Sequence, residues 1–466
     1  MNKDLDERLV PKGEYREAQN ILITQSESSD VGAIENIEGN ALAVPMPIIT
    51  GDLETIGYFA DTLNKKAYWF ITDFTGDDGD VRTMSRAQSS NTCQILMADL
   101  NNTSEEAKII VQGHFLNFSK NHLITGVNLI DDLLFFTDNY NQPRKINVTR
   151  AEADNTYYTK EEQISVAKVV PYLAPILHNS SGQGDNTTIT NNSDITSDYL
   201  KDRFVRFSYR YKYEDGEYTT MAPFTQIVFK PLNEGNIDNI LTTSREETDV
   251  QDVYSKTIVD IMKNHYNQVE VRIPLPGDEY QTDSSIDWNN ELRITKLEIL
   301  VKESDQDVVK VVKEIDVNDN NSFTSLLETR PIVYGTTSTT YYRHVYKYVY
   351  KSEEPYKILE DKQITRVFDQ VPLRAKSQEI SGNRVIYGNF TENYELPTDS
   401  NGKSGINYVI NSTSKGDTAI SSIFNNNPQY NKAVYKNHSI KQKRKYQVGV
   451  VLIDKFGRQS PVILST

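Results

Sequence analysis

The chain is dominated by short runs in which apolar and polar residues alternate, and turn residues bound each run. Residues 207–213 place Phe or Tyr at every second position, and residues 214–216 follow as an acidic turn with glycine. A period of two puts one set of side chains on each face of a β-strand. The 28 Tyr and 16 Phe also suit half-buried strands better than helices. We therefore predict an all-β protein, with residues 248–265 as its one plausible helix.

One kind of hairpin recurs three times. Each copy is a polar turn followed by an apolar strand, and a short apolar strand precedes it. The copies lie at 64–73, 130–138 and 381–389, and the preceding strands at 56–59, 124–127 and 377–380. Such hairpins are what the blades of a β-propeller contribute, so we predict β-propeller-like hairpin repeats. About 66 residues separate the first two copies, so a run of hairpins without a closed propeller is the alternative.

A second architecture interrupts these repeats. Alternating strands in residues 201–340 predict an inserted β-sandwich of the immunoglobulin or fibronectin kind. Residues 446–462 match the hairpin at 207–224, and this match predicts a terminal sandwich of which one hairpin is present. Its sheet is finished by strands from elsewhere or from a partner, or the chain is the amino-terminal portion of something longer.

The predicted domains follow from these patterns and from two polar stretches rich in Asn, Ser and Thr. They are 1–177 as the first part of the propeller, 178–200 as a linker, 201–340 as the inserted sandwich, 341–398 as the return to the propeller, 399–435 as a polar loop, and 436–466 as the hairpin of the second sandwich.

The charge balance argues against a nucleic-acid reader. Fifty Lys and Arg residues against 65 Asp and Glu give a formal net charge of -15, which repels phosphate and anionic membranes. Cys93 is the single cysteine, so no disulfide forms within the chain. The start of the chain is charged, and no apolar run approaches the roughly 18 residues that a membrane span needs. We expect synthesis in a cytoplasm and no membrane anchor.

No spacing of residues supports catalysis or metal binding, so we predict no catalytic, cofactor-binding or metal-ligating residue and no cofactor. Residues 401–404 resemble the end of a phosphate loop, but Pro397 stands where glycine is required. Residues 316–323 begin like a calcium loop, but Asn321 replaces the glycine and Leu327 the bidentate carboxylate. Residues 76–80 carry oxygens that suit a solvated hairpin tip better than a cation site. The six histidines are scattered, at 114, 122, 178, 265, 344 and 438.

Three further clusters have structural interpretations that outweigh the functional ones. The acid pairs 131–132 and 353–354 could serve glycoside hydrolysis only across a cleft, and adjacent acids on a strand point to opposite faces. The basic run 441–445 suits a solvated strand edge better than a contact with nucleic acid or an acidic subunit. The aromatic and cationic residues 341–350 suit an aromatic strand face better than a platform for base stacking.

Four blocks of sequence carry a family resemblance: residues 6–21, 29–40, 375–384 and 454–462. Together they resemble the tail nozzle or muzzle proteins of short-tailed, crAss-like bacteriophages. The resemblance implies a protein that is not an enzyme, in which propeller and sandwich domains form a ring around the DNA exit channel. It places that ring distal to the portal and the tail hub, where it closes the tail until adsorption.

This resemblance and the residue patterns lead to one functional prediction. We predict a structural virion protein that forms a homo-oligomeric ring, a hexamer, at the distal end of a short phage tail. Its predicted partners are the tail hub, other tail proteins, tail fibres and the passing double-stranded DNA, which it does not bind sequence-specifically. The alternatives are a carbohydrate-binding or carbohydrate-degrading tail protein and a cell-surface adhesion protein.

Overall fold

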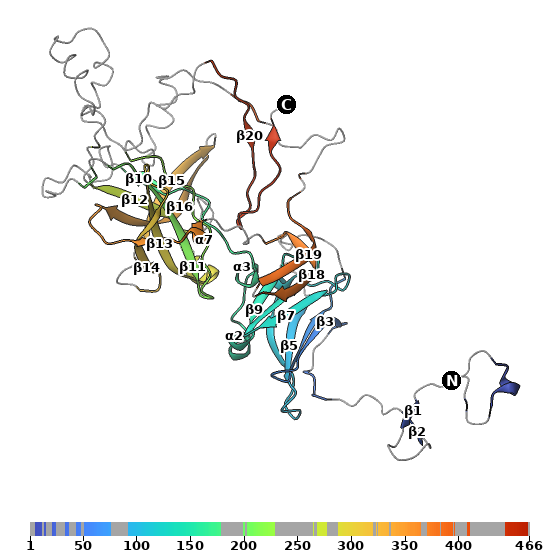
Figure 1. Cartoon of the computed structure of the whole chain (residues 1–466). Helices are drawn as coiled ribbons and strands as arrows, with labels where there is room; N and C mark the ends of the chain where they lie inside the picture. Colours follow the sequence, from blue (N-terminus) through green and yellow to red (C-terminus); the bar gives the residue numbers. More distant parts are fainter. Residues whose placement is uncertain are drawn as a thin grey trace, which may run out of the picture.

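The computed structural model contains several antiparallel sheets and a few short helices (Figure 1). The prediction of an all-β protein is therefore confirmed. The structure describes residues 5–11, 14, 21–24, 33–36, 43–47, 51–75, 92–178, 199–200, 203–228, 264, 268–276, 288–319, 323, 325–334, 337–364, 371–382, 384–394, 396, 408–410 and 443–464.

The first large sheet is a four-stranded antiparallel meander. Its strands follow one another in space in the order in which they occur along the chain. Such an order needs only short connections between neighbouring strands. The strands are β3 (Glu54–Asp61), β4 (Lys66–Thr72), β5 (Cys93–Asp99) and β6 (Lys108–Gln112). Near the N-terminus, β1 (Ile21–Thr24) and β2 (Ala33–Asn36) form a separate hairpin.

A three-stranded sheet follows, and a hairpin from much later in the chain lies beside it. The sheet holds β7 (Gly126–Ile130), β8 (Leu133–Thr137) and β9 (Arg144–Asn147). The hairpin consists of β18 (Arg374–Ser381) and β19 (Arg384–Thr391). The carbonyl of Ala375 accepts hydrogen bonds from the Thr137 hydroxyl at 2.6 Å and from the Asn139 amide at 3.0 Å. These bonds fix the late hairpin on the early sheet across more than 230 residues of sequence.

Two glycines permit the close approach of these pieces. A Cβ atom at Gly57 of β3 would lie 2.5 Å from Ile124, and one at Gly126 of β7 would lie 2.7 Å from the Gln378 side chain. Contacts that short do not occur between real side chains, so any larger residue would push the strands apart. We call β3 to β9, the segment 148–170 that packs on the same core, and the β18–β19 hairpin together the hairpin unit.

A single aromatic-rich core holds the two early sheets together. Phe70, Phe118 and Phe136 meet with ring centroids 5.1 to 6.1 Å apart and are almost fully buried. Rings at these separations gain edge and tilted contacts beyond the burial of their surface. The three predicted hairpin copies are all present as β3–β4, β7–β8 and β18–β19. Their closure into a propeller stays a prediction.

Two four-stranded antiparallel sheets form the second unit, which we call the sandwich. One sheet has the order β10-β12-β16-β15 and the other the order β11-β13-β14-β17. The strands are β10 (Ile176–His178), β11 (Val205–Tyr213), β12 (Val269–Pro274), β13 (Ile294–Glu303), β14 (Val309–Asp316), β15 (Ser325–Tyr334), β16 (Thr337–Tyr350) and β17 (Lys357–Ile358).

The two sheets of the sandwich share one core because each turns an alternating apolar face toward the other. Phe207 of β11 meets Tyr350 of β16 edge-on at 5.2 Å, and the Tyr211 hydroxyl donates to the Pro274 carbonyl at 3.2 Å. The strands of this unit run from 176 to 358, whereas the sequence analysis placed the inserted sandwich at 201–340. Residues 341–350 belong to β16, in which 345–350 pair with β12 and 341–346 with β15, so they continue the sandwich. An immunoglobulin-like or fibronectin-like topology stays a prediction.

The helices of the described residues are short, and the sequence did not predict them. They are α2 (Val148–Ala153), α3 (Glu161–Ile164), α6 (Trp288–Leu292), α7 (Asp361–Ile364) and the 3-10 turns η1 (Glu7–Leu9) and η2 (His114–Leu116). Segments of one or two turns are too short to display a 3.6-residue period. The predicted helix at 248–265 lies outside the described residues except for Asn264, as do most of the 178–200 linker and the 399–435 loop.

Candidate functional site

The strand β9 and the helix α2 carry two cations to one side of the hairpin unit. Lys145 of β9 has a side chain only 2% exposed, and Arg150 lies in α2. The helix begins at Asn147, whose side chain accepts from the Arg150 amide at 3.0 Å, a standard N-cap. The Tyr158 hydroxyl accepts from the Asn147 amide at 2.8 Å. These bonds set the direction in which the two cations point.

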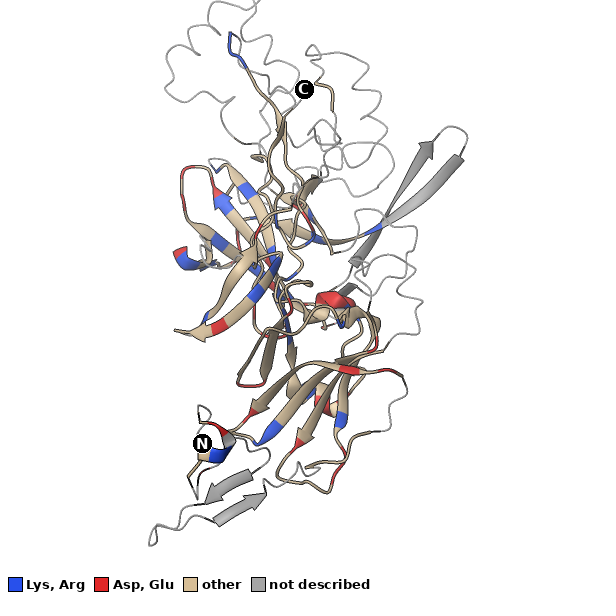
Figure 2. Ribbon diagram, turned by 90° about the vertical axis from the view of Figure 1, so that its right-hand side faces the viewer, with Lys and Arg blue, Asp and Glu red and all other residues tan. Residues whose placement is uncertain are grey.

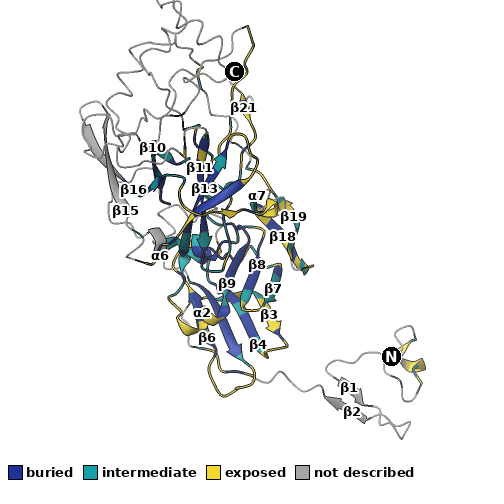
Figure 3. Cartoon of the chain, turned by 60° about the vertical axis from the view of Figure 1, so that its left-hand side comes forward, coloured by how far each residue is buried: buried dark blue, intermediate teal, exposed yellow. Residues whose placement is uncertain are grey.

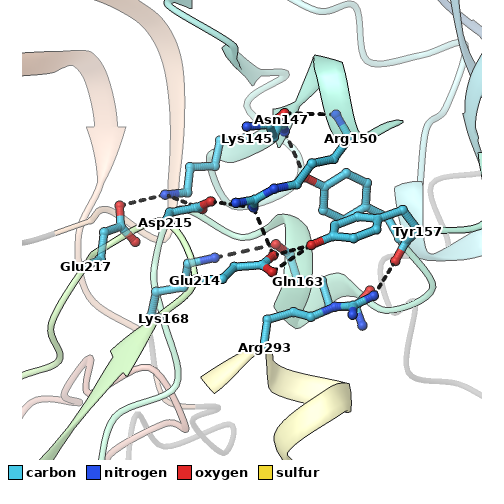
Figure 4. A network of polar contacts seen from close by, with 11 residues as sticks. Lys145, Asn147, Arg150, Tyr157, Gln163, Lys168, Glu214, Asp215, Glu217 and Arg293 are labelled. Carbon is cyan, nitrogen blue, oxygen red and sulfur yellow. Dashed lines mark hydrogen bonds and ion pairs between the residues drawn. The ribbon is translucent and has the colours of Figure 1, made fainter. Parts of the chain in front are cut away.

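The acidic turn after β11 meets these cations. Lys145 Nζ lies 2.6 Å from Glu217 Oε1 and 3.3 Å from Asp215 Oδ2. Arg150 Nη1 lies 2.9 Å from Asp215 Oδ1 and 3.1 Å from Glu214 Oε1. Figure 4 shows the three carboxylates of this turn beside the two cations, with dashed lines that mark the pairs. Charged pairs at these distances form strong hydrogen bonds because both partners are ionised.

A tyrosine and an arginine extend this network toward β13. The Tyr157 hydroxyl donates to Glu214 at 2.6 Å, and burial together with that carboxylate raises the pKa of Tyr157 to about 12. Arg293 lies over the Tyr157 ring at 4.4 Å and donates to the Tyr157 carbonyl at 2.8 Å (Figure 4). Arg293 has a left-handed backbone with φ of 61°, and its own carbonyl accepts from the Glu214 amide at 3.2 Å.

Burial decides the electrostatics of Lys168, which lies beneath the acidic turn. Its ammonium group is 5.5 Å from the Tyr213 ring and 3.4 Å from the Gln163 carbonyl. Desolvation, followed by the neighbouring positive charge of Lys145, lowers the pKa of Lys168 to about 8 in spite of the nearby acids. Burial alone would raise the pKa of Asp215, but the charges of Lys145 and Lys168 outweigh burial and lower it.

A second attachment lies next to the first along the chain. Lys455 pairs with Glu162 of α3, and the Lys455 carbonyl accepts from the Val170 amide at 3.0 Å. Gly457 approaches Val170 so closely that a Cβ there would lie 3.1 Å from its side chain. Residues 162–170 therefore contact both Tyr213, which ends β11 of the sandwich, and the turn at 454–458.

We call the first attachment the interdomain junction. Its members come from β9, α2, the 157–168 segment, the turn after β11 and the start of β13. They are Lys145, Arg150, Tyr157, Lys168, Glu214, Asp215, Glu217 and Arg293. Each of its carboxylates is paired with a cation or a phenol of the other unit. Chemically, the arrangement can orient one unit on the other, because partly buried charged groups that share several partners tolerate few alternative geometries.

The residues singled out in the sequence do not come together. His122 stacks on Tyr140 at 4.3 Å, His114 lies in η2, and His178 and His344 lie on strands of the sandwich, while 265 and 438 are outside the described residues. Cys93 is buried, with its sulfur 3.5 Å from the Thr72 hydroxyl. Among the residues that the structure describes, no group of three or more His, Cys, Asp or Glu could hold a metal ion.

Of the loops whose sequences resemble ion-binding motifs, the one that the structure partly describes has a structural role. In the 316–323 loop, Asp316 accepts from the Asn318 amide at 2.9 Å, which closes an ordinary Asx turn. Residues 76–80, 401–404 and 441–442 lie outside the described residues, and 443–445 are exposed. The aromatic run at 341–350 lies in β16, where Tyr348 and Tyr350 belong to the sandwich core. The prediction of an aromatic strand face is confirmed for these two residues.

The acid pairs also have local roles. Asp131 adopts a left-handed backbone with φ of 50° in the turn between β7 and β8, and the Asp132 carbonyl accepts from Val148 at 2.8 Å. Glu354 accepts from the Tyr348 hydroxyl at 3.3 Å. Sequence reasoning missed the interdomain junction because its acids and cations are about 70 residues apart. The one available signal was the density of acids in the turn at 214–217, beside a buried aromatic strand.

The fold and the junction define a class: an all-β protein of several sheets, in which paired charges join two units. Among the described residues there is no catalytic constellation. The family described as Crassvirus muzzle protein matches residues 1–324, and the chain belongs to this family. It is thus a structural tail protein of a phage. No curated protein matches the chain. Within the described residues, none of the helices is long and apolar enough to span a membrane.

Proposed function

We propose that the protein is the nozzle of a short phage tail: a ring of identical subunits around the DNA exit channel that retains the genome and opens for ejection. Membership of the muzzle family is the observation that carries this proposal. We propose six subunits, and neighbours in the tail hub, the other tail proteins and the fibres. In a closed ring each subunit presents two different surfaces to its neighbours, and both must be held at a fixed angle.

The interdomain junction suits that requirement. A ring closes only if every subunit has the same shape, so a hinge between its units would scatter the angle from one copy to the next. Partly buried ion pairs that share several partners oppose such a hinge. The junction thus supports the proposal as a device that keeps hairpin unit and sandwich in one orientation.

The charge of the chain supports the passage of DNA. A net charge of -15 per subunit repels phosphate and favours sliding over sticking. On the described elements, acidic and basic positions are interspersed (Figure 2). We propose that DNA passes without sequence-specific contacts and that the subunit catalyses no reaction.

Electron microscopy tests the proposal directly. Purified protein and phage particles are imaged in parallel, and the subunit is located on the particles with an antibody fragment against the chain. We expect end-on rings with an axial channel and six-fold symmetry, and antibody density at the tail tip. A protein that stays monomeric at all concentrations and is absent from the particle tail would refute it.

A DNA-retention assay at low salt tests the charge argument separately. We expect no retention of double-stranded DNA at about 50 mM salt, where non-specific electrostatic binding is strongest. Retention that disappears with added salt would show that the ring binds the genome through phosphates and would contradict the sliding argument. The alternative of a polysaccharide-degrading tail protein predicts release of reducing sugars from host polysaccharide, whereas the nozzle releases none.

A further inference from the structure

The segment 446–464, which we call the C-terminal hairpin, repeats the opening hairpin of the sandwich, which is β11 with residues 214–228. The two segments align when Gly457 is matched to Gly216, so that the numbers of equivalent residues differ by 241. Both glycines have left-handed backbones, with φ of 82° and 84°. Each turn is closed by a bond from the glycine amide to the carbonyl three residues earlier, at 3.0 Å in both.

The hydrogen bonds that flank the turn also match, donor for donor. They include bonds between backbones and bonds through a hydroxyl of the second arm. The pairs are Tyr213 N to Glu217 O (2.8 Å) and Asp454 N to Arg458 O (3.0 Å), Thr219 N to Tyr211 O (2.9 Å) and Ser460 N to Leu452 O (2.8 Å), and Tyr211 N to Thr219 Oγ1 and Leu452 N to Ser460 Oγ (both 3.0 Å). In this alignment Pro461 is equivalent to Thr220. The sequence pattern by itself matches Pro461 to Pro223, three positions later.

Both hairpins also form hydrogen bonds with the same segment of the hairpin unit, residues 169–170. The Tyr213 hydroxyl of the opening hairpin donates to the Val169 carbonyl at 2.7 Å. The Lys455 carbonyl of the C-terminal hairpin accepts from the adjacent Val170 amide at 3.0 Å. The two turns, Tyr213–Glu217 and Asp454–Arg458, are therefore alike in internal bonding, and both bond to the adjacent residues Val169 and Val170.

Burial separates the two copies. In the opening hairpin, Phe207, Tyr209 and Tyr211 are at most 1% exposed, because the other sheet of the sandwich covers them. In the C-terminal hairpin, Val448 and Leu452, the equivalents of Phe207 and Tyr211, are 45% and 43% exposed, and Val450, the equivalent of Tyr209, is partly exposed. Figure 3 shows this hairpin largely as an exposed element, in contrast to the buried strands of the sandwich. So exposed an apolar strand face is unusual on a protein surface that binds no partner.

The edge of the C-terminal hairpin is open as well. In β11 the backbone groups of odd-numbered residues bond to the second arm, so those of the even-numbered residues face β13. The equivalent groups of Gly449, Val451 and Ile453 face away from their own arm. No described strand pairs along this edge, and β13 is itself held between β11 and β14.

The side chain at position 451 indicates which strand fits the edge. Its equivalent in β11 is Arg210, which pairs with Glu298 of β13 at 2.7 Å, with both side chains almost fully buried. Val451 can neutralise no carboxylate, so an acid opposite it would be buried without a partner. Gly449 adds no side chain on this face, because a Cβ there would lie 2.4 Å from Val462.

We propose that the edge 449–453 of the C-terminal hairpin is a docking site for one antiparallel β-strand of a second polypeptide, a strand with aliphatic side chains on both faces at its centre. The docked strand takes the register that β13 takes against β11. It covers Val448 and Leu452 on one face and Val451 and Ile453 on the other. Main-chain hydrogen bonds supply affinity, and the uncharged residue opposite Val451 supplies selectivity.

Two synthetic peptides test this edge on the full 466-residue chain. The first has the sequence of β13, Ile294–Glu303, and the second is the same peptide with Glu298→Val. Binding is followed by hydrogen exchange of the amides of 449, 451 and 453. We expect the Glu298→Val peptide to protect these amides and to bind at least tenfold more tightly than the parent peptide, because only the parent buries an unpaired carboxylate.

A matched variant of the chain reverses this preference. Val451→Arg restores the cation of the opening hairpin, so we expect it to bind the parent peptide more tightly than the Glu298→Val peptide. The proposal is overturned if neither peptide protects the edge at millimolar concentration. It is also overturned if a scrambled peptide protects the edge equally, if Val451→Arg leaves the preference unchanged, or if these amides are already protected in the isolated chain. None of these outcomes depends on the ring that we propose for the tail.

Discussion

Asp215 is the residue on which the interdomain junction depends most, because it joins two cations of the hairpin unit. Its two oxygens lie 3.3 Å from Lys145 Nζ and 2.9 Å from Arg150 Nη1, and its side chain is 16% exposed. The substitution Asp215→Asn keeps the shape of the side chain and one acceptor oxygen but removes the negative charge. We expect this single change to loosen the docking of the sandwich on the hairpin unit.

The expected size of the effect follows from what remains after the change. Removing one partner of a fully buried ion pair costs about 3–5 kcal/mol, because the other charge is left without compensation. Here Lys145 keeps Glu217, Arg150 keeps Glu214, and Asp215 itself has some contact with solvent. We therefore expect Asp215→Asn to lower the free energy of local opening at the junction by about 2–3 kcal/mol, less than the full cost of a buried pair.

Native-state hydrogen exchange measures this opening free energy without requiring the whole multidomain chain to unfold in one step. The reporters are the amides of Tyr213 and Glu214, because their bonds to the carbonyls of Glu217 and Arg293 hold the acidic turn that carries Asp215 at the junction. The matched control is Asp307→Asn, the same chemical change in an ion pair with Lys302 whose acid is fully exposed. We expect the control to exchange like the unmodified protein, because exposed pairs contribute little.

The reasoning is wrong if Asp215→Asn and Asp307→Asn give the same exchange at the two reporter amides. It is also wrong if Asp215→Asn accelerates exchange evenly over all sheets, since that would indicate a loss of global stability. A further check is a double-mutant cycle with Lys145→Met, in which contacting charges should show a coupling free energy of at least about 0.5 kcal/mol.

Three further predictions follow. Acid should open the junction and the second attachment, because the pKa of Asp215 in the first and of Glu162 in the second is lowered. Their stabilisation is complete above about pH 5 and is lost as pH falls through the lowered values, which a falling urea midpoint below about pH 5 would show. Lys168 has a pKa of about 8 in the folded protein, so stability should rise between about pH 8 and 9.5, and Lys168→Met should abolish that rise in the urea midpoint. Gly126→Ala should displace Gln378 and destabilise the docked β18–β19 hairpin by about 1–3 kcal/mol, seen as faster exchange in β18 while β11 is unchanged.

Local pattern was enough to predict strands, hairpins and turns. The alternation in 207–213 became β11, the three hairpin copies formed as pairs, and Tyr348 and Tyr350 took their places on an aromatic strand face. A period of two and a turn residue act over a few positions, so they are legible in the sequence. The match between the two hairpins was equally visible, because acidic turns with glycine follow apolar strands in both.

Only the tertiary structure decided which of these strands and turns contact one another. Lys145 and Glu217 are 72 residues apart, and Ala375 accepts from a residue 238 positions earlier, so no local pattern announces either contact. The end of the sandwich at β17 and the one-turn helices were equally invisible, since pairing and capping decided them. The opening hairpin and its C-terminal copy have nearly the same turn and backbone bonds, but they differ in burial. The apolar strand face is covered in the opening hairpin and exposed in the C-terminal hairpin. That difference depends on which strands reach the edge, and a sequence pattern does not record it.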